Sequence, residues 1–379
     1  MKLIRTLALT AAMSMALPAT GAMAQALDRD VGLPLQEAQS LAQRGNTSAA
    51  MARVRTARSA ADSALERRRV TEMSAYVNTV ARNYAAAARD LESIGAPASR
   101  LAPLYYQAGN YERAIELGQR MGGTQGNTIV AQSYVRQGNF QAAADLYERL
   151  IEQNGPQQNL LENLASAQFK LEQRDEYLET IERLIRLDPT PQRWNRLLND
   201  LKGDLTTRDA QLALYKLIGE TNNLNRPEDF IEFAKFATVA EQPGVANRIV
   251  TQGLEAGTLS AEDPQVQSIV RASEQGMASA AADFASLKPG PEGYYRMANT
   301  FFGAENYRAA AVAYWRSYQQ QRDLNSPPYK NQALIGLGVS ALRAGDTDLA
   351  QKAFQLVDDD SAFNEVAALW ALYADTSGA

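Results

Sequence analysis

The sequence contains no cysteine and no histidine, and these two absences exclude whole classes of chemistry. Without cysteine the chain can form neither a disulfide nor the acylated anchor of a lipoprotein, and without either residue it cannot build a Cys/His zinc site. The missing imidazole also removes the base of Ser-His and Cys-His catalytic groups. The sequence therefore predicts no bound metal, no cofactor and no catalysis of these familiar kinds.

Excess positive charge is also absent. The 38 Lys and Arg residues are outnumbered by 43 Asp and Glu residues, which leaves a net charge of −5. A nucleic-acid-binding protein is expected to carry a clustered positive field, so we expect no nucleic acid partner. Hydrophobic residues make up 45% of the 379 positions, enough for a large buried core, so the chain is expected to fold.

The first 24 residues have the order of a secretory signal peptide. Lys2 and Arg5 precede an apolar run over residues 7–17, Pro18 follows, and small residues lead to Ala24. We therefore predict a signal peptide over residues 1–24, a short linker over 25–34, and a folded chain from 35 to 375. The protein is then exported to the periplasm, with secretion as the alternative.

Long hydrophobic runs are lacking along the whole chain. The alternative to a signal peptide is an N-terminal membrane anchor, but the run over 7–17 is about half of the roughly 20 residues that a spanning helix needs. No later stretch is longer and equally apolar. The mature chain is therefore predicted to have no transmembrane helix.

The rest of the sequence is built from an internal repeat. Glycine and proline fall mainly between segments of helical periodicity, and strand-like alternation is scarce, so the chain is expected to be all-α. In each repeat a large–small pair is followed by a third packing residue, a second small residue and a large one. The clearest copies begin at Leu101-Ala102, Val130-Ala131, Phe233-Ala234, Met297-Ala298 and Leu337-Gly338.

This order resembles the tetratricopeptide repeat, a helix-turn-helix unit of about 34 residues. The aligned second position is taken by Ala50, Ala87, Ala114, Ala143, Tyr177, Ala210, Ala246, Ala281, Ala310 and Ala350. The intervals average about 33 residues, close to the period of the family. The resemblance implies a right-handed α-solenoid of about ten hairpins over residues 35–375, closed by a capping helix over 363–373, and its alanine-rich layout is similar to exported proteins of Gram-negative bacteria.

Residues 63–94 allow two interpretations. Apolar residues step by threes and fours through the segment without glycine or proline, as in one long helix. The register of the repeat instead places a break near Asn83. We expect two helices with a break there.

The resemblance also implies a function and a binding face. Stacked hairpins form an extended surface, so we expect a non-catalytic scaffold that binds a peptide or protein of the cell envelope. In the family the first helix of each hairpin lines the concave side. Carried over, this indicates Tyr106, Gln132, Arg136, Phe169, Lys170, Asn195, Asn199, Lys235, Tyr295, Asn299 and Phe302 as partner-binding residues. Among them Lys170, Asn199 and Lys235 loosely resemble the residues with which some members hold a terminal carboxylate.

Aromatic residues are concentrated between positions 294 and 315. The repeat assigns Tyr294, Phe301 and Tyr314 to the core. Their neighbours Tyr295, Phe302 and Trp315 are then the candidates for exposed binding anchors.

Charge is distributed unevenly along the chain. Arginines gather between residues 53 and 69, and aspartates between 346 and 360. This asymmetry could steer an anionic partner, but a solvated helix surface explains it more simply.

The alternative functions are a carboxylate-based glycan-active enzyme or an accessory factor for polysaccharide or outer-membrane assembly. Exported helical solenoids include lytic transglycosylases, in which a Glu-Ser pair opens the catalytic domain. The pair Glu92-Ser93 is present here, but it is followed by Ile94-Gly95 rather than by the further signatures of those enzymes. We therefore favour the scaffold.

Overall fold

A computed structural model describes residues 27–322, 324 and 327–377 of the protein. Within these residues the regular structure consists of twenty α-helices joined by short turns and loops, with no strand. This confirms the predicted all-α solenoid of helix-turn-helix repeats. None of the described helices is both long and apolar enough to cross a membrane. The chain divides into two compact units, Met1–Asn139 (unit 1) and Phe140–Ala379 (unit 2).

The N-terminal boundary differs from the prediction. The proposed signal peptide, residues 1–24, lies outside the described residues. The predicted linker over 25–34 is wrong for its second half, because the first helix begins at Arg29. Val31 and Leu35 on this helix are buried, so the segment belongs to the core rather than to a connection.

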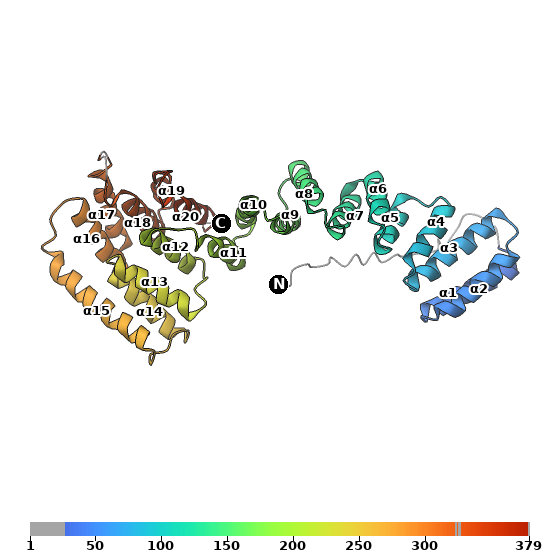
Figure 1. Ribbon diagram of the computed structural model, residues 1–379, viewed down its shortest axis with the longest axis horizontal. Helices are drawn as coiled ribbons and strands as arrows, with labels where there is room; N and C mark the ends of the chain where they lie inside the picture. Colours follow the sequence, from blue (N-terminus) through green and yellow to red (C-terminus); the bar gives the residue numbers. More distant parts are fainter. Residues whose placement is uncertain (1–26, 323, 325–326, 378–379) are drawn as a thin grey trace. The chain divides into compact units, whose positions relative to one another are not determined.

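Unit 1 consists of seven helices, most of them paired as antiparallel hairpins (Figure 1). They are α1 (Arg29–Gln43), α2 (Thr47–Ala60), α3 (Ala64–Val80), α4 (Tyr84–Ser93), α5 (Ala98–Gln107), α6 (Tyr111–Met121) and α7 (Gly123–Arg136). Each packs chiefly against the helices next to it in sequence. The break at residues 81–83 between α3 and α4 confirms the two-helix interpretation.

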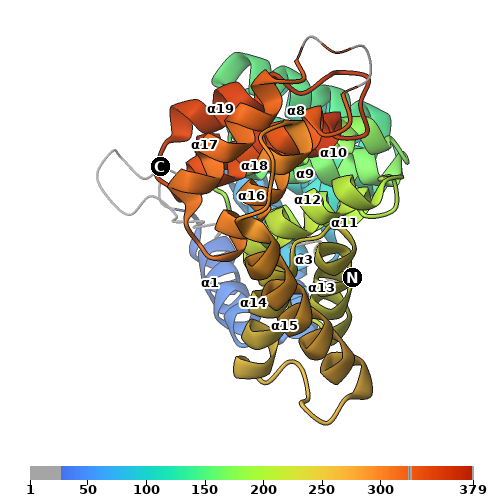
Figure 2. The same cartoon turned by 90° about the vertical axis from the view of Figure 1, so that its left-hand side faces the viewer.

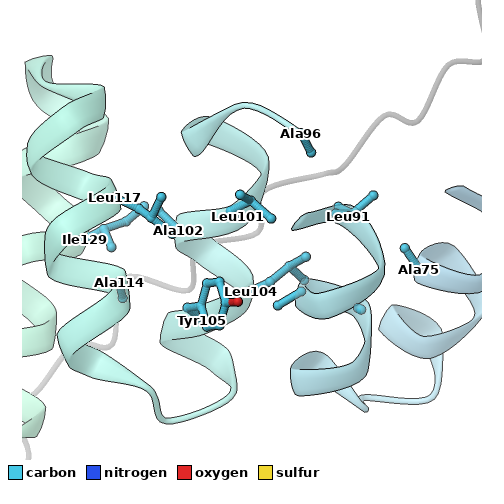
Figure 3. Packing of buried hydrophobic residues seen from close by; sticks show 12 residues of the cluster. Ala75, Leu91, Ala96, Leu101, Ala102, Leu104, Tyr105, Ala114, Leu117 and Ile129 are labelled. Atoms are coloured by element: carbon cyan, nitrogen blue, oxygen red, sulfur yellow. The ribbon is translucent and has the colours of Figure 1, made fainter. Parts of the chain in front are cut away.

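Small residues allow the helices of unit 1 to approach closely. Ala87, Ala102 and Ala114 are fully buried, and Leu104 and Leu117 fill the space beside them (Figure 3). Alanine at a crossing brings two backbones together, and the larger side chains then exclude water from the flanks. This is the packing that the repeat pattern predicts.

A capping box fixes the start of α3. The Ser63 hydroxyl accepts a hydrogen bond from the Glu66 amide at 3.1 Å, and Glu66 Oε2 accepts one from the Ser63 amide at 3.0 Å. The other oxygen of Glu66 accepts from the amide of Asp28 at 3.0 Å. These backbone hydrogen bonds lower the pKa of Glu66 to about 2, so the carboxylate stays charged and ties the start of α3 to the residue before α1.

Unit 2 contains thirteen helices (Figure 1). They are α8 (Phe140–Asn154), α9 (Gln158–Lys170), α10 (Arg174–Leu187), α11 (Pro191–Leu201), α12 (Arg208–Glu220), α13 (Pro227–Val239), α14 (Pro243–Glu255), α15 (Pro264–Phe284), α16 (Pro291–Gly303), α17 (Tyr307–Gln319), α18 (Lys330–Arg343), α19 (Thr347–Gln355) and α20 (Asn364–Thr376).

The hairpin α18–α19 shows why the repeat needs its small residue. A Cβ added at Gly338 would lie 2.3 Å from a ring carbon of Phe354, a distance that real structures do not allow. Phe354 on α19 thus packs directly onto the backbone of α18. Ala350, at the aligned second small position, is fully buried between the two helices.

One repeat is absent where the alignment predicted it. Ala281 was assigned to the second helix of a hairpin, but the chain there forms the single 21-residue helix α15, and Ala281 is exposed. Gly276 provides no turn, because it lies within this helix and faces Pro243, whose Cβ would be 2.8 Å from an added Cβ. Figure 2 shows α15 running beside α13 and α14.

The last helix closes unit 2 upon itself. The predicted cap over 363–373 corresponds to α20, which packs against α19 but also against α10, α12 and α18. Trp370 is completely buried, and its indole Nε1 donates to the carbonyl of Ala213 on α12 at 3.1 Å, across 157 residues of sequence. The last helix therefore does more than cover a terminal apolar face, and α12 is enclosed.

Candidate functional site

Three of the predicted binding residues lie in unit 1. Tyr106 is on α5, and Gln132 and Arg136 are on α7. Arg136 is exposed, and its Nε donates to the Tyr106 hydroxyl at 3.3 Å. The structure thus brings Tyr106 and Arg136 together from neighbouring first helices, with half-buried Gln132 one turn before Arg136 on α7.

Phe169 and Lys170 form the most exposed part of the predicted set in unit 2. Both lie at the C-terminal end of α9, and Phe169 is 63% exposed. Among the described residues its ring has one aromatic neighbour, Tyr177 of α10, at 5.9 Å between centroids. Leaving a large apolar ring in water is unfavourable, so this position is available to a partner.

Asn195, Asn199 and Lys235 lie on two further first helices. Asn199 Nδ2 donates to Asn195 Oδ1 at 2.8 Å along one face of α11. Lys235 is exposed on α13 and borders an open apolar hollow of about 520 Å³ between α13 and α15, together with Val239 and Ile269. The described contacts do not join Lys170, Asn199 and Lys235 into one carboxylate-binding group.

The prediction is wrong for two residues of α16. Phe302 is 1% exposed and Asn299 is 4% exposed, so neither faces a groove. Asn299 Oδ1 accepts a hydrogen bond from the Tyr314 hydroxyl at 2.6 Å. Tyr295 is half-buried and stacks on Tyr329 at 4.8 Å. The face of α16 that the family leaves open is covered here, because unit 2 closes and brings α12 and α18 opposite it.

The remaining aromatic candidate is partly accessible. Trp315 on α17 is 38% exposed and contacts Tyr318 at 5.4 Å. Phe301, assigned to the core by the repeat, is half-buried, whereas its neighbour Phe302 is fully buried. The core position of the pair is therefore Phe302.

A cluster of basic residues inside unit 2 escaped the sequence analysis. Lys216 on α12, Arg248 on α14 and Arg343 on α18 line a cavity of about 170 Å³ that also includes Glu220 and Phe302. The signal in the sequence is a lysine within the apolar run 212–218 of α12, all of which is buried. The repeat pattern predicts only the pairing of helices within a hairpin, so it did not indicate that α12, α14 and α18 lie together.

Lys216 is held in an unusual environment. Its Nζ donates to Gln242 Oε1 at 2.8 Å and lies 4.6 Å from the centre of the Phe302 ring. Burial, together with the positive charges of Arg248 and Arg343, lowers the pKa of Lys216 to about 7. Among the described groups Asp209 opposes this shift.

The two arginines are only partly neutralised. Arg343 Nε donates to Glu220 Oε1 at 2.7 Å, and its Nη1 donates to the Tyr307 hydroxyl at 2.8 Å. Arg248 has one described carboxylate partner, Glu305, at 3.4 Å, and that carboxylate is 58% exposed. Burial lowers the pKa of Arg248, which shows that its environment compensates the charge poorly.

Some of the charged residues noted near the two ends of the sequence form ion pairs within their own unit. Arg53 meets Glu37 at 2.9 Å, and Arg69 meets Glu72 at 2.9 Å. Near the C-terminus Asp358 accepts from Lys330 Nζ at 2.6 Å. These pairs favour the interpretation of solvated helix surfaces.

Glu92 does not have the chemistry of a glycosidase acid. Its carboxylate accepts hydrogen bonds from the Tyr105 hydroxyl and, at 2.6 Å, from Arg113 Nη2. The bond from Tyr105, followed by that from Arg113, lowers the pKa of Glu92. A general acid requires a raised pKa, so the contacts of Glu92 oppose the role of proton donor.

Comparison with known proteins places the repeats in a family for part of the chain. Among curated proteins, none matches the sequence significantly. Solved structures that are similar include a chain of Naa15/Naa10 bound to HypK-THB, with 12% identity over 90% of this chain and 67% of the other and a TM-score of 0.39. Yeast Tom70 shows 14% identity over 93% and 90% of the two chains, with a TM-score of 0.21. A chain of the APC/C hetero-tetramer Cut9-Hcn1 shows 14% identity over 81% and 72%, with a TM-score of 0.24.

The family assignment comes from the sequence between α7 and α10. Residues 131–190 match the profile of the tetratricopeptide repeat family. They include Ala131, Ala143 and Tyr147 of one copy of the repeat and end one residue after Asp188-Pro189, which corresponds to the closing proline of the motif. Residues 131–190 are therefore a tetratricopeptide repeat region.

Proposed function

We propose that the protein is a non-catalytic scaffold of the bacterial cell envelope that binds a peptide or protein through the first helices of its open hairpins. Two features support this proposal: a tetratricopeptide repeat region over residues 131–190 and exposed polar and aromatic side chains on first helices. Such repeats present extended surfaces whose amide, cationic and aromatic groups suit an extended chain.

The observation that carries the proposal is the exposure of Phe169 beside Lys170. The end of α9 offers an aromatic ring, 63% exposed, next to an exposed cation for which no carboxylate partner is described. Aromatic residues that become buried in a complex often contribute most of its binding energy. We assign this pair the central contact in unit 2, and Tyr106 with Arg136 a contact of the same kind in unit 1.

Site-specific photo-crosslinking in cells tests the binding surface. A benzoylphenylalanine at position 170 should form a discrete crosslinked product with the partner. Phe169→Ala in the same chain should reduce the yield about fivefold or more, because the anchor is lost. The matched control carries the crosslinker at Val312, a residue of α17 in the same unit that is 55% exposed.

The crosslinking yields at positions 170 and 312 are compared to test the docking site. A product from position 170 that is absent from position 312 and depends on Phe169 supports the proposal. Equal products from both positions, or no effect of Phe169→Ala, would show that α9 is not a specific docking site.

The cellular location is a separate part of the proposal. The order of charged, apolar and small residues before Ala24 supports cleavage there and export to the periplasm. Cell fractionation with mass spectrometry of the N-terminus should find a chain that starts at Gln25. Recovery of an intact Met1 in the cytoplasm would contradict this part alone.

A further inference from the structure

The cavity between α12, α14 and α18 is the least explained feature of the molecule. It lies within unit 2 and is lined by basic, apolar and amide side chains, including Lys216, Arg248, Arg343 and Gln252. It is distinct from Phe169 and Lys170, which lie on α9. Whatever fills it does not depend on the partner-binding surface proposed above.

Charge in this cavity is out of balance. Lys216, Arg248 and Arg343 carry three positive charges when protonated, and the described carboxylates that pair with them are Glu220 and Glu305. Glu305 is 58% exposed, so water weakens its effect on Arg248. Lys216 is buried and the Arg248 side chain is 24% exposed, so holding their like charges beside the exposed Arg343 is costly unless an anion accompanies them.

The arrangement of donors suits oxygen atoms. Guanidinium groups present paired N–H donors that match carboxylate and phosphate oxygens. Arg248 and Arg343 come from two different helices, and Lys216 adds a third donor group from α12. Because cationic side chains from three helices line the same cavity, an anion inside it would have donors on more than one side.

The volume of the cavity limits which ligands it can hold. Pockets for drug-sized ligands usually measure about 300–1,000 Å³. The cavity here has about 170 Å³, so it is too small for a nucleotide but large enough for an anion of a few heavy atoms. It is also partly covered by Phe302 and Val339, which favours a free solute over a peptide segment.

We propose that this cavity binds a small free oxyanion, of the size of phosphate or a short dicarboxylate, between Lys216, Arg248 and Arg343. The anion neutralises the excess positive charge inside unit 2. It thereby joins α12 to α14 and α18, helices that are brought together only by the closure of the unit.

Isothermal titration calorimetry of the purified protein tests the proposal. Inorganic phosphate is titrated at pH 7 in a chloride buffer of low ionic strength, and malonate is titrated in parallel. We expect one saturable site per chain for at least one of the two anions. Tighter binding of phosphate identifies a tetrahedral ligand, and tighter binding of malonate identifies a dicarboxylate.

Variants locate the site. Arg248→Gln should weaken binding at least tenfold, and Arg343→Gln should do the same. The matched control is Arg271→Gln, which removes a guanidinium from the exposed surface of α15 and should leave the affinity unchanged. Arg248→Gln is the decisive variant if Arg343→Gln fails to fold, since the described contacts of Arg248 are the 3.4 Å ion pair with Glu305 and the ring of Phe302.

A fourth variant is expected to raise the affinity for the anion instead of lowering it. Glu220 competes with the anion for Arg343, so Glu220→Gln should strengthen binding severalfold. An adventitious surface site would not respond in this direction. Absence of saturable binding, unchanged affinity in Arg248→Gln, or no gain in Glu220→Gln would each overturn the assignment.

Discussion

Unit 1 and the closed part of unit 2, α11 to α20, use the same hairpin but build different interiors. In unit 1 helices pack chiefly on their sequence neighbours, and even the hydrogen bond from the Asp28 amide to Glu66 spans only 38 residues. In unit 2 Trp370 reaches Ala213 across 157 residues, and Arg343 reaches Glu220 across 123. The repeat alone produces only neighbour packing, and closure requires contacts that lie outside the repeat.

The two interiors also differ in polarity. Among its described residues unit 1 buries three polar side chains, Glu66, Ser74 and Ser133, and has alanine at the helix crossings. The closed part of unit 2 buries Lys216, Asp229, Gln242 and Asn299. Residues that face solvent in an open solenoid become internal when the unit closes, so they must find hydrogen-bond partners inside. This difference predicts that unit 2 depends on single distant contacts and unit 1 does not.

The largest effect is expected when the closing contact is removed. Trp370→Ala deletes a fully buried indole and should lower the free energy of unfolding by about 3–5 kcal/mol, because a cavity remains. Urea denaturation followed by far-UV circular dichroism measures the change. The matched control is Trp315→Ala, at a position 38% exposed, which should cost about 1 kcal/mol or less. Equal losses would mean that α20 does not close the unit.

A smaller effect is expected from the buried lysine of unit 2. The pKa of Lys216 is about 7 in the folded state against an ordinary value of 10.5, so between these values the unfolded state binds more protons. The free energy of unfolding should therefore rise with pH above 7, by about 1–3 kcal/mol up to pH 9. Denaturation at pH 7 and pH 9 tests this, and Lys216→Met should abolish the rise. A pH dependence that persists in Lys216→Met would assign it to other groups.

The smallest effect is expected in unit 1. Ser63→Ala removes the side-chain acceptor that caps α3 and should cost about 1 kcal/mol. Because packing in unit 1 is local, hydrogen exchange should accelerate in α3 and its immediate neighbours and remain unchanged in α20. Ser63→Thr keeps the hydroxyl and serves as the control. Faster hydrogen exchange in α20 would contradict the claim that packing in unit 1 is local.

Much of the fold follows from local sequence. Ala87, Ala114 and Ala350 are buried at the positions that the repeat assigns to them, and Asn83 marks the start of α4 after a break. These features depend on residues within one hairpin, so periodicity and turn residues suffice to predict them. The same reasoning failed at Ala281, because Gly276, a possible turn residue in the sequence, lies inside α15 and faces Pro243.

The candidate site was predicted only in part for the same physical reason. Phe169 is exposed, as expected of a groove position, but Phe302 and Asn299 are buried although they have the same place in their repeat. Phe302 lies against Lys216 of α12 and lines a cavity with Val339 of α18, two helices that are distant from it in sequence. The sequence did not single out Lys216, because the feature that distinguishes it is the shared cavity with Arg248 and Arg343. No local sequence pattern connects these three residues.

The sequence by itself determined the helices, their alanine-mediated pairing and the exclusion of cysteine and histidine chemistry. These properties arise from side-chain size and periodicity over about thirty residues. Tertiary structure decided which first-helix residues remain accessible and which charges become buried. The contact between α12 and α20 is responsible, because the hydrogen bond from Trp370 to Ala213 closes unit 2 and buries a helix surface that an open solenoid would expose.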